Sequence, residues 1–448
     1  MIGGQEVNGK EVSMLKNDNR INVLYLTWGE QISSSGIIGN QVFGQVKTIT
    51  SFAKDVTIQI MTGIPLYSRA YLHDKYQLLG NHDELSNELI ANGINLNIRY
   101  IRILPRWFYS KFHITPFYYL NHMHYFRDFV RKNNIDIVHC RSYHATNLAL
   151  KVKTKYDMRF KIIFDTRGLF PEEAVFRGDF NENSFSYKVW KRTEKRMLDE
   201  SDAIVNVSDT FTQHISNITN NPNIFTIYTS VNMDIFSKNK NTRQNIRHQL
   251  GISNDEKVLV YSGFIGKQGW HQISSLVRVF KEFQNVFRNT RLLVVTLVDH
   301  SPLRLQLERE LGNDSFLLVK GNTPRQTSEY LQAADYSCLP YKTVKDHIEA
   351  IVSKTVVASK TGEYFAVGLP LIVNNAVGAA SHLVERYGVG CTYPVGREDE
   401  IRNAIVELDN NYETVSDNCV EVARNYFSSE KNAKAYIDIY HQLIGKNS

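Results

Sequence analysis

Short runs of apolar residues recur along this chain, and stretches with helical spacing of apolar side chains lie between them. Five such runs fall in the first half, at residues 21–26, 56–62, 135–139, 161–165 and 203–208. Buried parallel strands read as continuous apolar runs, and helices connect one strand to the next. The pattern therefore predicts a doubly wound α/β domain, with its first helix at about residues 40–53.

The same pattern begins again in the second half of the chain. Its apolar runs lie at residues 257–262, 291–296, 315–319, 336–339 and 371–373. This repetition predicts a second α/β domain. Two such domains that face one another suit a ligand bound at the carboxyl ends of the strands.

The boundaries follow from the polar stretches. Residues 1–20 are polar, and we expect them to be a disordered leader. An N-terminal Rossmann-like domain is predicted over residues 21–230 and a C-terminal one over 231–428, with a linker near 231–241. A last helix is expected at about 429–445. Its apolar residues have helical spacing and are Tyr436, Ile439, Tyr440 and Leu443.

The composition narrows the class of protein. A chain of 448 residues with 42% hydrophobic residues is expected to fold throughout, as two domains. Its net charge of +6 suits anionic partners such as nucleotide phosphates or a lipid surface, and does not require nucleic acid. The four scattered cysteines favour a reducing compartment and no metal site. No apolar run approaches the ~18 residues that a membrane span needs.

The segment at residues 359–370, Ser-Lys-Thr-Gly-Glu-Tyr-Phe-Ala-Val-Gly-Leu-Pro, is the most informative motif. It places Lys360, Gly362 and Glu363 at the start of a short helical stretch that ends on Gly-Leu-Pro before a strand. A helix that opens on glycine beside a buried strand leaves its N-terminus free for an anion, and a glutamate in its first turn can accept two sugar hydroxyls. The alternative is a capped helix packed on a strand.

This segment resembles the donor-site signature of the retaining glycosyltransferases of the GT-B fold, family 4. Other segments are similar to family motifs in the same order along the chain: 164–173, 229–236, 261–269 and 333–335. The resemblance implies two Rossmann-like domains across a cleft and metal-independent transfer of a hexose-type sugar, without a cofactor. It implies a UDP-sugar or GDP-sugar donor whose ribose binds Glu363. It assigns the diphosphate to Lys267 and Lys360.

Two positions depart from the family pattern. The first glutamate of the usual Glu-x7-Glu pair is Thr355 here, which puts the contact to the donor sugar in doubt. The usual arginine of the Gly-Arg-Leu loop is Phe264, so Lys267 is the main cation left in that loop.

Glycines and polar residues in the predicted loops complete the donor site. Gly36 and Gly39 flank the loop after the first strand, where the backbone can approach a phosphate; a plain strand-to-helix turn is the alternative. Gly263 opens the first loop of the second domain. By family analogy Asn322, after a strand of that domain, lies near the nucleotide base, although turn chemistry also explains it.

Arg167 and His144, with Lys267, are the candidates for a catalytic role. Arg167 follows a buried strand and is expected to face the cleft; a structural salt bridge to Glu172 or Glu173 is the alternative. His144 follows the strand at 135–139, and a structural role is its alternative. A retaining reaction by front-face attack needs no protein nucleophile at a fixed place, so the sequence names no catalytic base.

A basic, aromatic segment runs from Leu89 to Arg127 without any aspartate or glutamate. Aromatic rings beside cations suit a lipid interface. Two alternatives are that the rings pack inside the domain while the cations snorkel, or that they stack on a saccharide acceptor. The residues chosen for membrane or acceptor contact are Arg106, Trp107, Tyr109 and Lys111.

Together these observations predict a cytoplasmic glycosyltransferase, with peripheral contact to the cytoplasmic face of a membrane. It would move a sugar from a nucleotide diphosphate sugar to a hydroxyl of a lipid-linked or polysaccharide glycan, in surface glycan biosynthesis. A sugar-nucleotide 2-epimerase of the same fold is one alternative. The other is a non-catalytic GT-B subunit that binds a nucleotide sugar, a reading that Thr355 and Phe264 favour.

Overall fold

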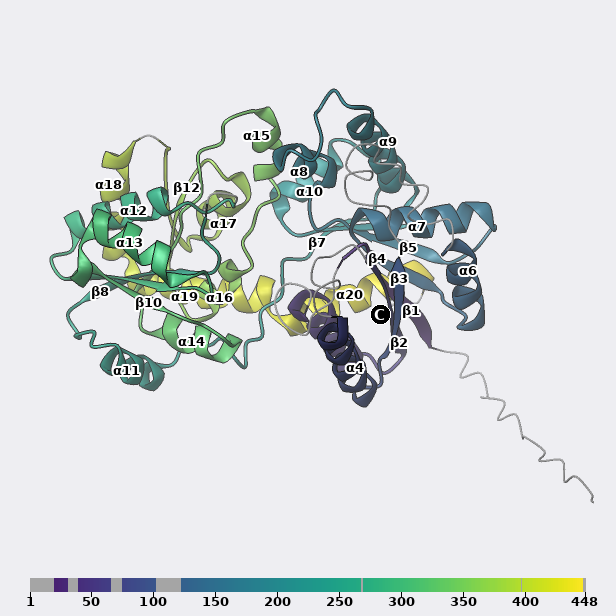
Figure 1. Ribbon diagram of the computed structural model, residues 1–448, viewed down its shortest axis with the longest axis horizontal. Coiled ribbons are helices and arrows are strands. Elements are labelled where there is room, and N and C mark those ends of the chain that lie inside the picture. Colours follow the sequence, from purple (N-terminus) through teal and green to yellow (C-terminus); the bar gives the residue numbers. More distant parts are fainter. Residues whose placement is uncertain are drawn as a thin grey trace, which may run out of the picture.

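Two parallel β-sheets, each covered by helices, form the two lobes of the molecule (Figure 1). The computed structural model describes residues 20–30, 39–65, 75–101, 122–266, 269–395 and 397–445. Helices connect the parallel strands within each sheet, as the apolar runs predict. The predicted fold class, two doubly wound α/β domains, is therefore confirmed.

The N-terminal sheet has seven strands in the order β3-β2-β1-β4-β5-β6-β7. The strands are β1 (Ile21–Trp28), β2 (Val56–Pro65), β3 (Asn95–Ile101), β4 (Ile137–Arg141), β5 (Lys161–Asp165), β6 (Ala203–Asn206) and β7 (Ile224–Thr226). The helices are η1 (Gly39–Gly44), α2 (Gln45–Phe52), α4 (Lys75–Ala91), α6 (Met123–Lys132), α7 (Ser142–Lys155), α8 (Phe170–Phe176), α9 (Phe185–Glu200) and α10 (Asp209–Ser216).

The C-terminal sheet has six strands in the order β10-β9-β8-β11-β12-β13. The strands are β8 (Lys257–Ser262), β9 (Thr290–Val295), β10 (Phe316–Val319), β11 (Tyr336–Leu339), β12 (Leu371–Asn374) and β13 (Gly390–Tyr393). The helices are α11 (Lys240–Gln249), α12 (Ile273–Val286), α13 (His300–Leu311), η3 (Asn313–Ser315), α14 (Pro324–Gln332), α15 (His347–Ser353), α16 (Lys360–Ala366), α17 (Gly378–Tyr387), α18 (Glu398–Asn410), α19 (Tyr412–Val422), η4 (Ala423–Phe427) and α20 (Ser429–Ile444).

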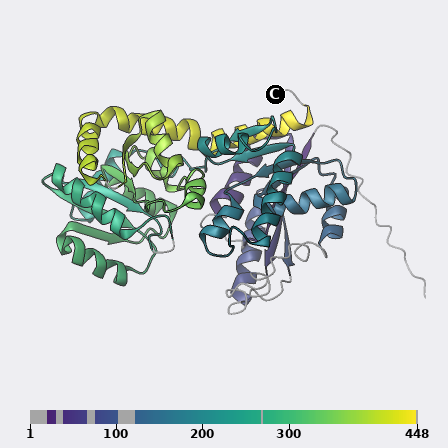
Figure 2. The same cartoon turned by 90° about the horizontal axis from the view of Figure 1, so that it is seen from above.

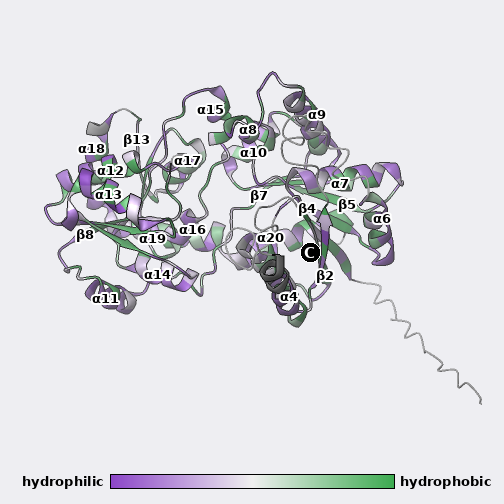
Figure 3. Cartoon of the chain, viewed as in Figure 1, coloured by the Kyte–Doolittle hydropathy of each residue, from purple (hydrophilic) through white to green (hydrophobic). Residues whose placement is uncertain are grey.

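Amphipathic helices close the faces of the sheets. In α12 the apolar residues Leu276, Phe280 and Phe283 follow the helical period and are buried against the sheet. Figure 3 shows the strands mainly green and outer helices such as α11 largely purple. Within the part of the chain that the structure describes, no helix is both long and apolar enough to cross a membrane.

Three strands were not predicted from the sequence, and each lies at an outer position of its sheet. Strand β3 is the first edge strand; its pattern mixes polar with apolar residues, and only its last residue is fully buried. Strand β7 has three half-buried residues, and β13 opens on a glycine. These three outer strands bury less surface than the central ones, so they lack the continuous apolar run on which the prediction depends.

The helix expected at 40–53 is divided into the π-helix η1 and the α-helix α2.

The chain crosses between the lobes twice, and the two crossings are bonded to one another. The amide of Val231 donates to the carbonyl of Phe427 at 2.7 Å, and the amide of Ser429 donates to the carbonyl of Val231 at 3.0 Å. After the second crossing, α20 runs from the C-terminal lobe onto the N-terminal lobe (Figures 1 and 2). Its Tyr436 and Tyr440 are buried in the core of the N-terminal domain.

The contact of α20 with the N-terminal sheet includes one buried polar pair. The hydroxyl of Tyr440 lies 2.8 Å from Nδ1 of His139, and both side chains are fully buried. Burial lowers the pKa of His139, so the ring is neutral. A buried nitrogen without a partner costs about 1–3 kcal/mol, so this pair fixes the position of α20 on the domain.

We therefore expect Tyr440→Phe to destabilise the protein by about 1–3 kcal/mol and to lower the midpoint of thermal unfolding by several degrees. Scanning calorimetry would measure the change. Asp438→Asn, at an exposed position of the same helix, is the control and should leave the midpoint unchanged. Equal midpoints for wild type and Tyr440→Phe would contradict the role given to the pair.

Candidate active site

A pocket of about 550 Å³ opens at the carboxyl ends of three adjacent strands of the C-terminal sheet. Its walls come from the ends of β8, β9 and β10, with Gly263, Thr296 and Gly321 among the lining residues. A Cβ at Gly321 would overlap the Thr327 hydroxyl oxygen and lie 2.9 Å from a methyl group of Val295, so the wall is packed closely around this glycine. Phe264 and Leu297 border the pocket and are about two-thirds exposed, at 64% and 66%. This volume suits a small organic ligand.

A buried hydrogen bond from the backbone holds helix α16 against the end of β8. The hydroxyl of Tyr364 accepts from the backbone amide of Ser262 at 2.7 Å, and both residues are buried. The helix begins at Lys360, two residues earlier than the glycine opening that the sequence predicts. It ends where the amide of Leu369 donates to the carbonyl of Tyr364, after Gly368 at a φ of +77°. With only seven residues its dipole is weak, so Lys360 is the main positive charge that α16 brings to this edge.

The Lys360 side chain lies directly beneath Gly263. Its Nζ donates to the hydroxyl of Tyr261 at 3.2 Å and lies 4.4 Å from the centre of that ring. Nδ1 of His271 is 3.4 Å from the same nitrogen. A Cβ at Gly263 would overlap the end of the lysine, and the φ of +112° there favours glycine as well. Burial lowers the pKa of Lys360 to about 7, against the opposing charge of Glu363.

Glu363 follows one turn after Lys360 on the same helix. Burial raises its pKa to about 7, while the nearby Lys360 charge lowers it. A carboxyl group and an amine whose pKa values both move toward neutrality in one desolvated place are typical of functional sites. Lys360 and Glu363 share α16, and Lys360 lies beneath Gly263, which lines the pocket, while neither side chain is itself among the lining residues; their predicted roles stay predictions.

The other residues predicted for the donor site have varied surroundings. A Cβ at Gly362 would lie 2.6 Å from the Phe427 ring and 2.7 Å from Val231, so this glycine lets α16 pack on the two chain crossings. Asn322 is exposed beside the pocket, and its backbone amide donates to the side-chain oxygen of Gln326. Gly39 is buried at the start of η1. The Thr355 hydroxyl donates to the carbonyl of Val352 and is buried.

Arg167 pairs with Asp165, at the end of β5, and not with the neighbouring glutamates of α8. Its guanidinium pairs with the fully buried carboxylate of Asp165 and donates to Gln45 at 3.3 Å. The expected alternative, a salt bridge to Glu172 or Glu173, is therefore wrong in its partner. The backbone φ of +60° is unusual for arginine and shows that the surrounding contacts fix this residue. A catalytic role for Arg167 stays a prediction.

His144 lies in the first turn of α7 among aromatic rings. Its ring centre is 5.3 Å from that of Phe170 and 5.1 Å from that of Trp190, both in edge-on contact. Burial lowers the pKa of His144 to about 4, so it is neutral near pH 7. In that state it can accept or donate a hydrogen bond but carries no charge.

Several predicted residues lie outside the described part of the chain. They are Gly36 in the donor site, Lys267 in the glycine loop, and the membrane or acceptor residues Arg106, Trp107, Tyr109 and Lys111. Their predicted roles stay predictions.

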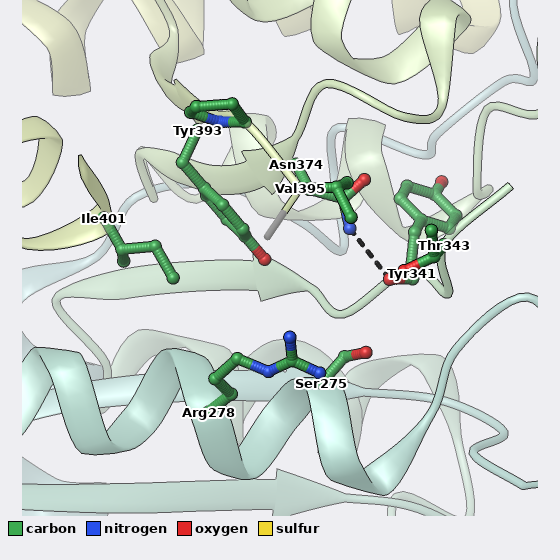
Figure 4. A pocket seen from close by; sticks show the side chains of 9 residues that line it. Ser275, Arg278, Tyr341, Thr343, Asn374, Tyr393, Val395 and Ile401 are labelled. Carbon is green, nitrogen blue, oxygen red and sulfur yellow. Dashed lines mark hydrogen bonds between the residues drawn. The ribbon is translucent and has the colours of Figure 1, made fainter. Parts of the chain in front are cut away.

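Two further pockets differ from the first in size or composition. One, at the ends of β11, β12 and β13, has a volume of about 20 Å³, enough for about one water molecule. Figure 4 shows Arg278 and Tyr393 directed into it, while the Asn374 amide donates to the carbonyl of Tyr341 at 2.8 Å. Another, of about 470 Å³, lies between the lobes, where Glu182 pairs with His347 at 2.8 Å.

The comparisons with known proteins agree with this geometry. The family described as Glycosyltransferase Family 4 matches residues 80–235, and the family described as Glycosyl transferases group 1 matches residues 242–426. The two matches fall one in each lobe and together span most of the chain. The protein belongs to the group 1 glycosyltransferases of the GT-B fold.

One curated relative is the lipopolysaccharide 1,2-N-acetylglucosaminetransferase of Salmonella typhimurium, 28% identical over 137 residues. That match covers 28% of this chain and 35% of the relative. A glycosyltransferase from Rickettsia africae has a similar structure, with a TM-score of 0.66, 15% identity, and 96% and 100% of the two chains covered. Anabaena Alr3699/HepE, solved in complex with UDP, gives a TM-score of 0.64 at 12% identity, covering 94% and 100%. At such identities the structures establish the fold alone.

The structure adds three site residues that the sequence did not indicate: Tyr261, His271 and Tyr364. Tyr261 is the penultimate residue of an ordinary apolar strand, and Tyr364 reads as one of several core aromatics. His271 lies just beyond the motif-like segment 261–269, where no pattern marked it. Only the glycine at 263, which follows Tyr261 by two residues, hinted that a group from elsewhere approaches this backbone closely.

The pKa of Lys360 can be measured directly. Acetic anhydride reacts with the neutral amine, so the rate of acetylation at Lys360, followed by peptide mass spectrometry, should rise through a midpoint near pH 7. In Gly263→Ala the new Cβ displaces the amine toward water, and the midpoint should move up toward the usual lysine range. Gly251→Ala is the matched control, because that glycine also has a positive φ (+63°) but meets nothing within 4 Å. A wild-type midpoint above pH 9 would contradict this account.

Proposed function

We propose that this protein is a retaining, metal-independent hexosyltransferase that uses a nucleotide diphosphate sugar. It transfers the sugar to a hydroxyl of a lipid-linked or polysaccharide glycan, in the synthesis of a surface glycan. The observation that carries the proposal is the position of Lys360 beneath Gly263, which lines the 550 Å³ pocket at the ends of β8, β9 and β10, with Glu363 one turn along the same helix. The UDP in the HepE complex and the lipopolysaccharide substrate of the Salmonella relative agree with this chemistry.

Each part of the site has a role in this reaction. The pocket lined by Phe264 and Leu297 takes the nucleoside, because apolar side chains can pack on the face of a base. Glu363 accepts hydrogen bonds from the ribose hydroxyls, a role in which its ionised form is the better acceptor. Lys360 neutralises the diphosphate, whose negative charge grows as the bond to the sugar breaks. The protein thereby stabilises the leaving group with its own cation.

The acceptor would approach from the N-terminal lobe, whose β4 and β5 carry His144 and Arg167 just beyond their carboxyl ends. Neutral His144 is suited to hydrogen bonding with a saccharide hydroxyl. The basic, aromatic segment that includes Arg106 and Trp107 would contact an anionic membrane or the acceptor itself. The site is proposed to work at the cytoplasmic face of that membrane.

Donor binding can be tested by thermal stability against UDP-, GDP-, ADP-, CMP- and dTDP-sugars. A ligand at one hundred times its dissociation constant stabilises the native state by about 2.7 kcal/mol, so one nucleotide class should raise the unfolding midpoint by several degrees. Glu363→Gln should lose that increase, because the amide has one acceptor oxygen in place of two. Glu421→Gln, at an exposed position of α19, is the matched control and should keep it.

The donor found in this way can then be used to test turnover. Incubation with a crude glycan acceptor should give a product whose new bond keeps the anomeric configuration of the donor, as measured by NMR. A 2-epimerase would change the donor without any acceptor, and a non-catalytic subunit would bind it without turnover. If no nucleotide sugar raised the midpoint of the wild type, the donor-site proposal would fail.

A further inference from the structure

The end of the Lys360 side chain occupies a defined space, which we call the lysine socket, formed by Tyr261, Gly263 and His271. Tyr261 closes one side with its ring and hydroxyl, and His271 closes another with Nδ1. Gly263 forms the roof, where any Cβ would overlap the lysine. Tyr261 is fully buried and His271 almost so, at 9% exposure, so both positions are set by the core of the domain.

The hydrogen bonds around the socket have a fixed direction. The hydroxyl of Tyr261 donates its proton to the carbonyl of Phe264, so its oxygen is left to accept from Lys360. The Tyr261 oxygen is also 3.0 Å from Nδ1 of His271. Because that oxygen gives its own proton to Phe264, Nδ1 carries the ring proton and donates toward the Tyr261 oxygen, which leaves Nε2 as a buried acceptor without a partner among the residues described. A buried donor is seldom left unsatisfied, so this tautomer, with its proton on Nδ1, is the favoured one, and His271 acts on Lys360 by orienting the Tyr261 hydroxyl.

We propose that Tyr261 and His271 are positioning residues that hold the charged form of Lys360 at the diphosphate site. This inference rests on the proposed function, because it assumes that Lys360 binds the diphosphate of the donor. The neutral Tyr261 oxygen, oriented by His271, accepts from the ammonium without cancelling its charge, as a carboxylate would, so the charge stays available to a diphosphate.

The groups that face Lys360 come from four elements. Glu363 lies on α16 itself, Tyr261 on β8, Cys338 on β11, and His271 in the loop before α12. Burial raises the pKa of the Cys338 thiol and lowers that of His271 well below its usual range, so both are neutral near pH 7. Tyr341 packs on the far side of His271, with ring centres 4.7 Å apart. Glu363 is therefore the one nearby group in this set whose charge changes near pH 7 together with that of Lys360.

The sign of the pH dependence follows from these groups. Burial lowers the pKa of Lys360 to about 7, so its positive charge is lost as the pH rises through that value. Binding of a diphosphate should then weaken by up to about tenfold per pH unit above 7. Removing an acceptor leaves the ammonium less stabilised, which lowers the pKa further and moves the onset of weak binding to lower pH.

The test is binding of UDP, GDP and ADP to the full-length protein, measured by titration calorimetry from pH 6.5 to 9. Wild type is compared with His271→Leu, His271→Asn and Tyr261→Phe, using the diphosphate that wild type binds most tightly. Asparagine can place its side-chain N–H near the position of Nδ1, and phenylalanine keeps the ring of Tyr261 while removing the hydroxyl. The nucleoside without phosphates serves as the control ligand, and circular dichroism confirms that each variant is folded.

We expect His271→Leu and Tyr261→Phe to bind the diphosphate about tenfold more weakly at pH 7.5, with the onset of weakening shifted to lower pH. His271→Asn should restore binding to within about threefold of wild type, and the nucleoside should bind all variants alike. Equal weakening at every pH, or no rescue by asparagine, would overturn the positioning role while leaving the donor site intact. No binding of any diphosphate to wild type would overturn the proposed function, and the inference with it.

Discussion

The arrangement of the two lobes depends on the bonded pair of chain crossings at Val231 and Ser428. The two segments form a short parallel bridge, in which the amides of Val231 and Ser429 donate hydrogen bonds to the opposite segment. Gly362 in the signature helix packs directly on the same place, against Val231 and Phe427. The helix that carries Lys360 and Glu363 thus rests on the point where the lobes are connected. A change in the angle between the lobes would therefore move the backbone segments on which this helix packs.

Burial of charge at the edge of the C-terminal sheet is the second constraint. An amine and a carboxyl in a desolvated place cost stability, since the protein must hold groups whose charged forms prefer water. Such local conflicts are expected where a protein binds or transforms a ligand, because the ligand supplies the missing partner. The Arg167–Asp165 pair differs, as the two charges already satisfy one another inside the N-terminal domain. The His139–Tyr440 contact on α20 is, by contrast, a hydrogen bond between neutral groups.

The central strands of both sheets were predictable because parallel strands buried on both faces leave an apolar run. The runs at 161–165 and 257–262 match β5 and β8. Edge strands such as β3 and β7 were not, since their exposed sides carry polar residues. At the site, the motif placed Lys360 and Glu363 together, but it put the start of the helix at Gly362 and gave that glycine a ligand. The structure shows that Gly362 makes room for Phe427 and Val231, while its contact with a donor stays a prediction.

The sequence by itself determined two doubly wound domains, their family, and the motif that brings a cation and a carboxyl to one helix, because these depend on local periodicity and short spacing. The tertiary structure alone decided what surrounds the cation. Lys360 lies 99 residues after Tyr261 and 89 residues after His271, and it meets them only because α16 packs on the end of β8 and the loop that follows. The burial that results from this packing lowers the pKa of Lys360. Desolvation is a property of the folded environment, and no spacing along the chain records it.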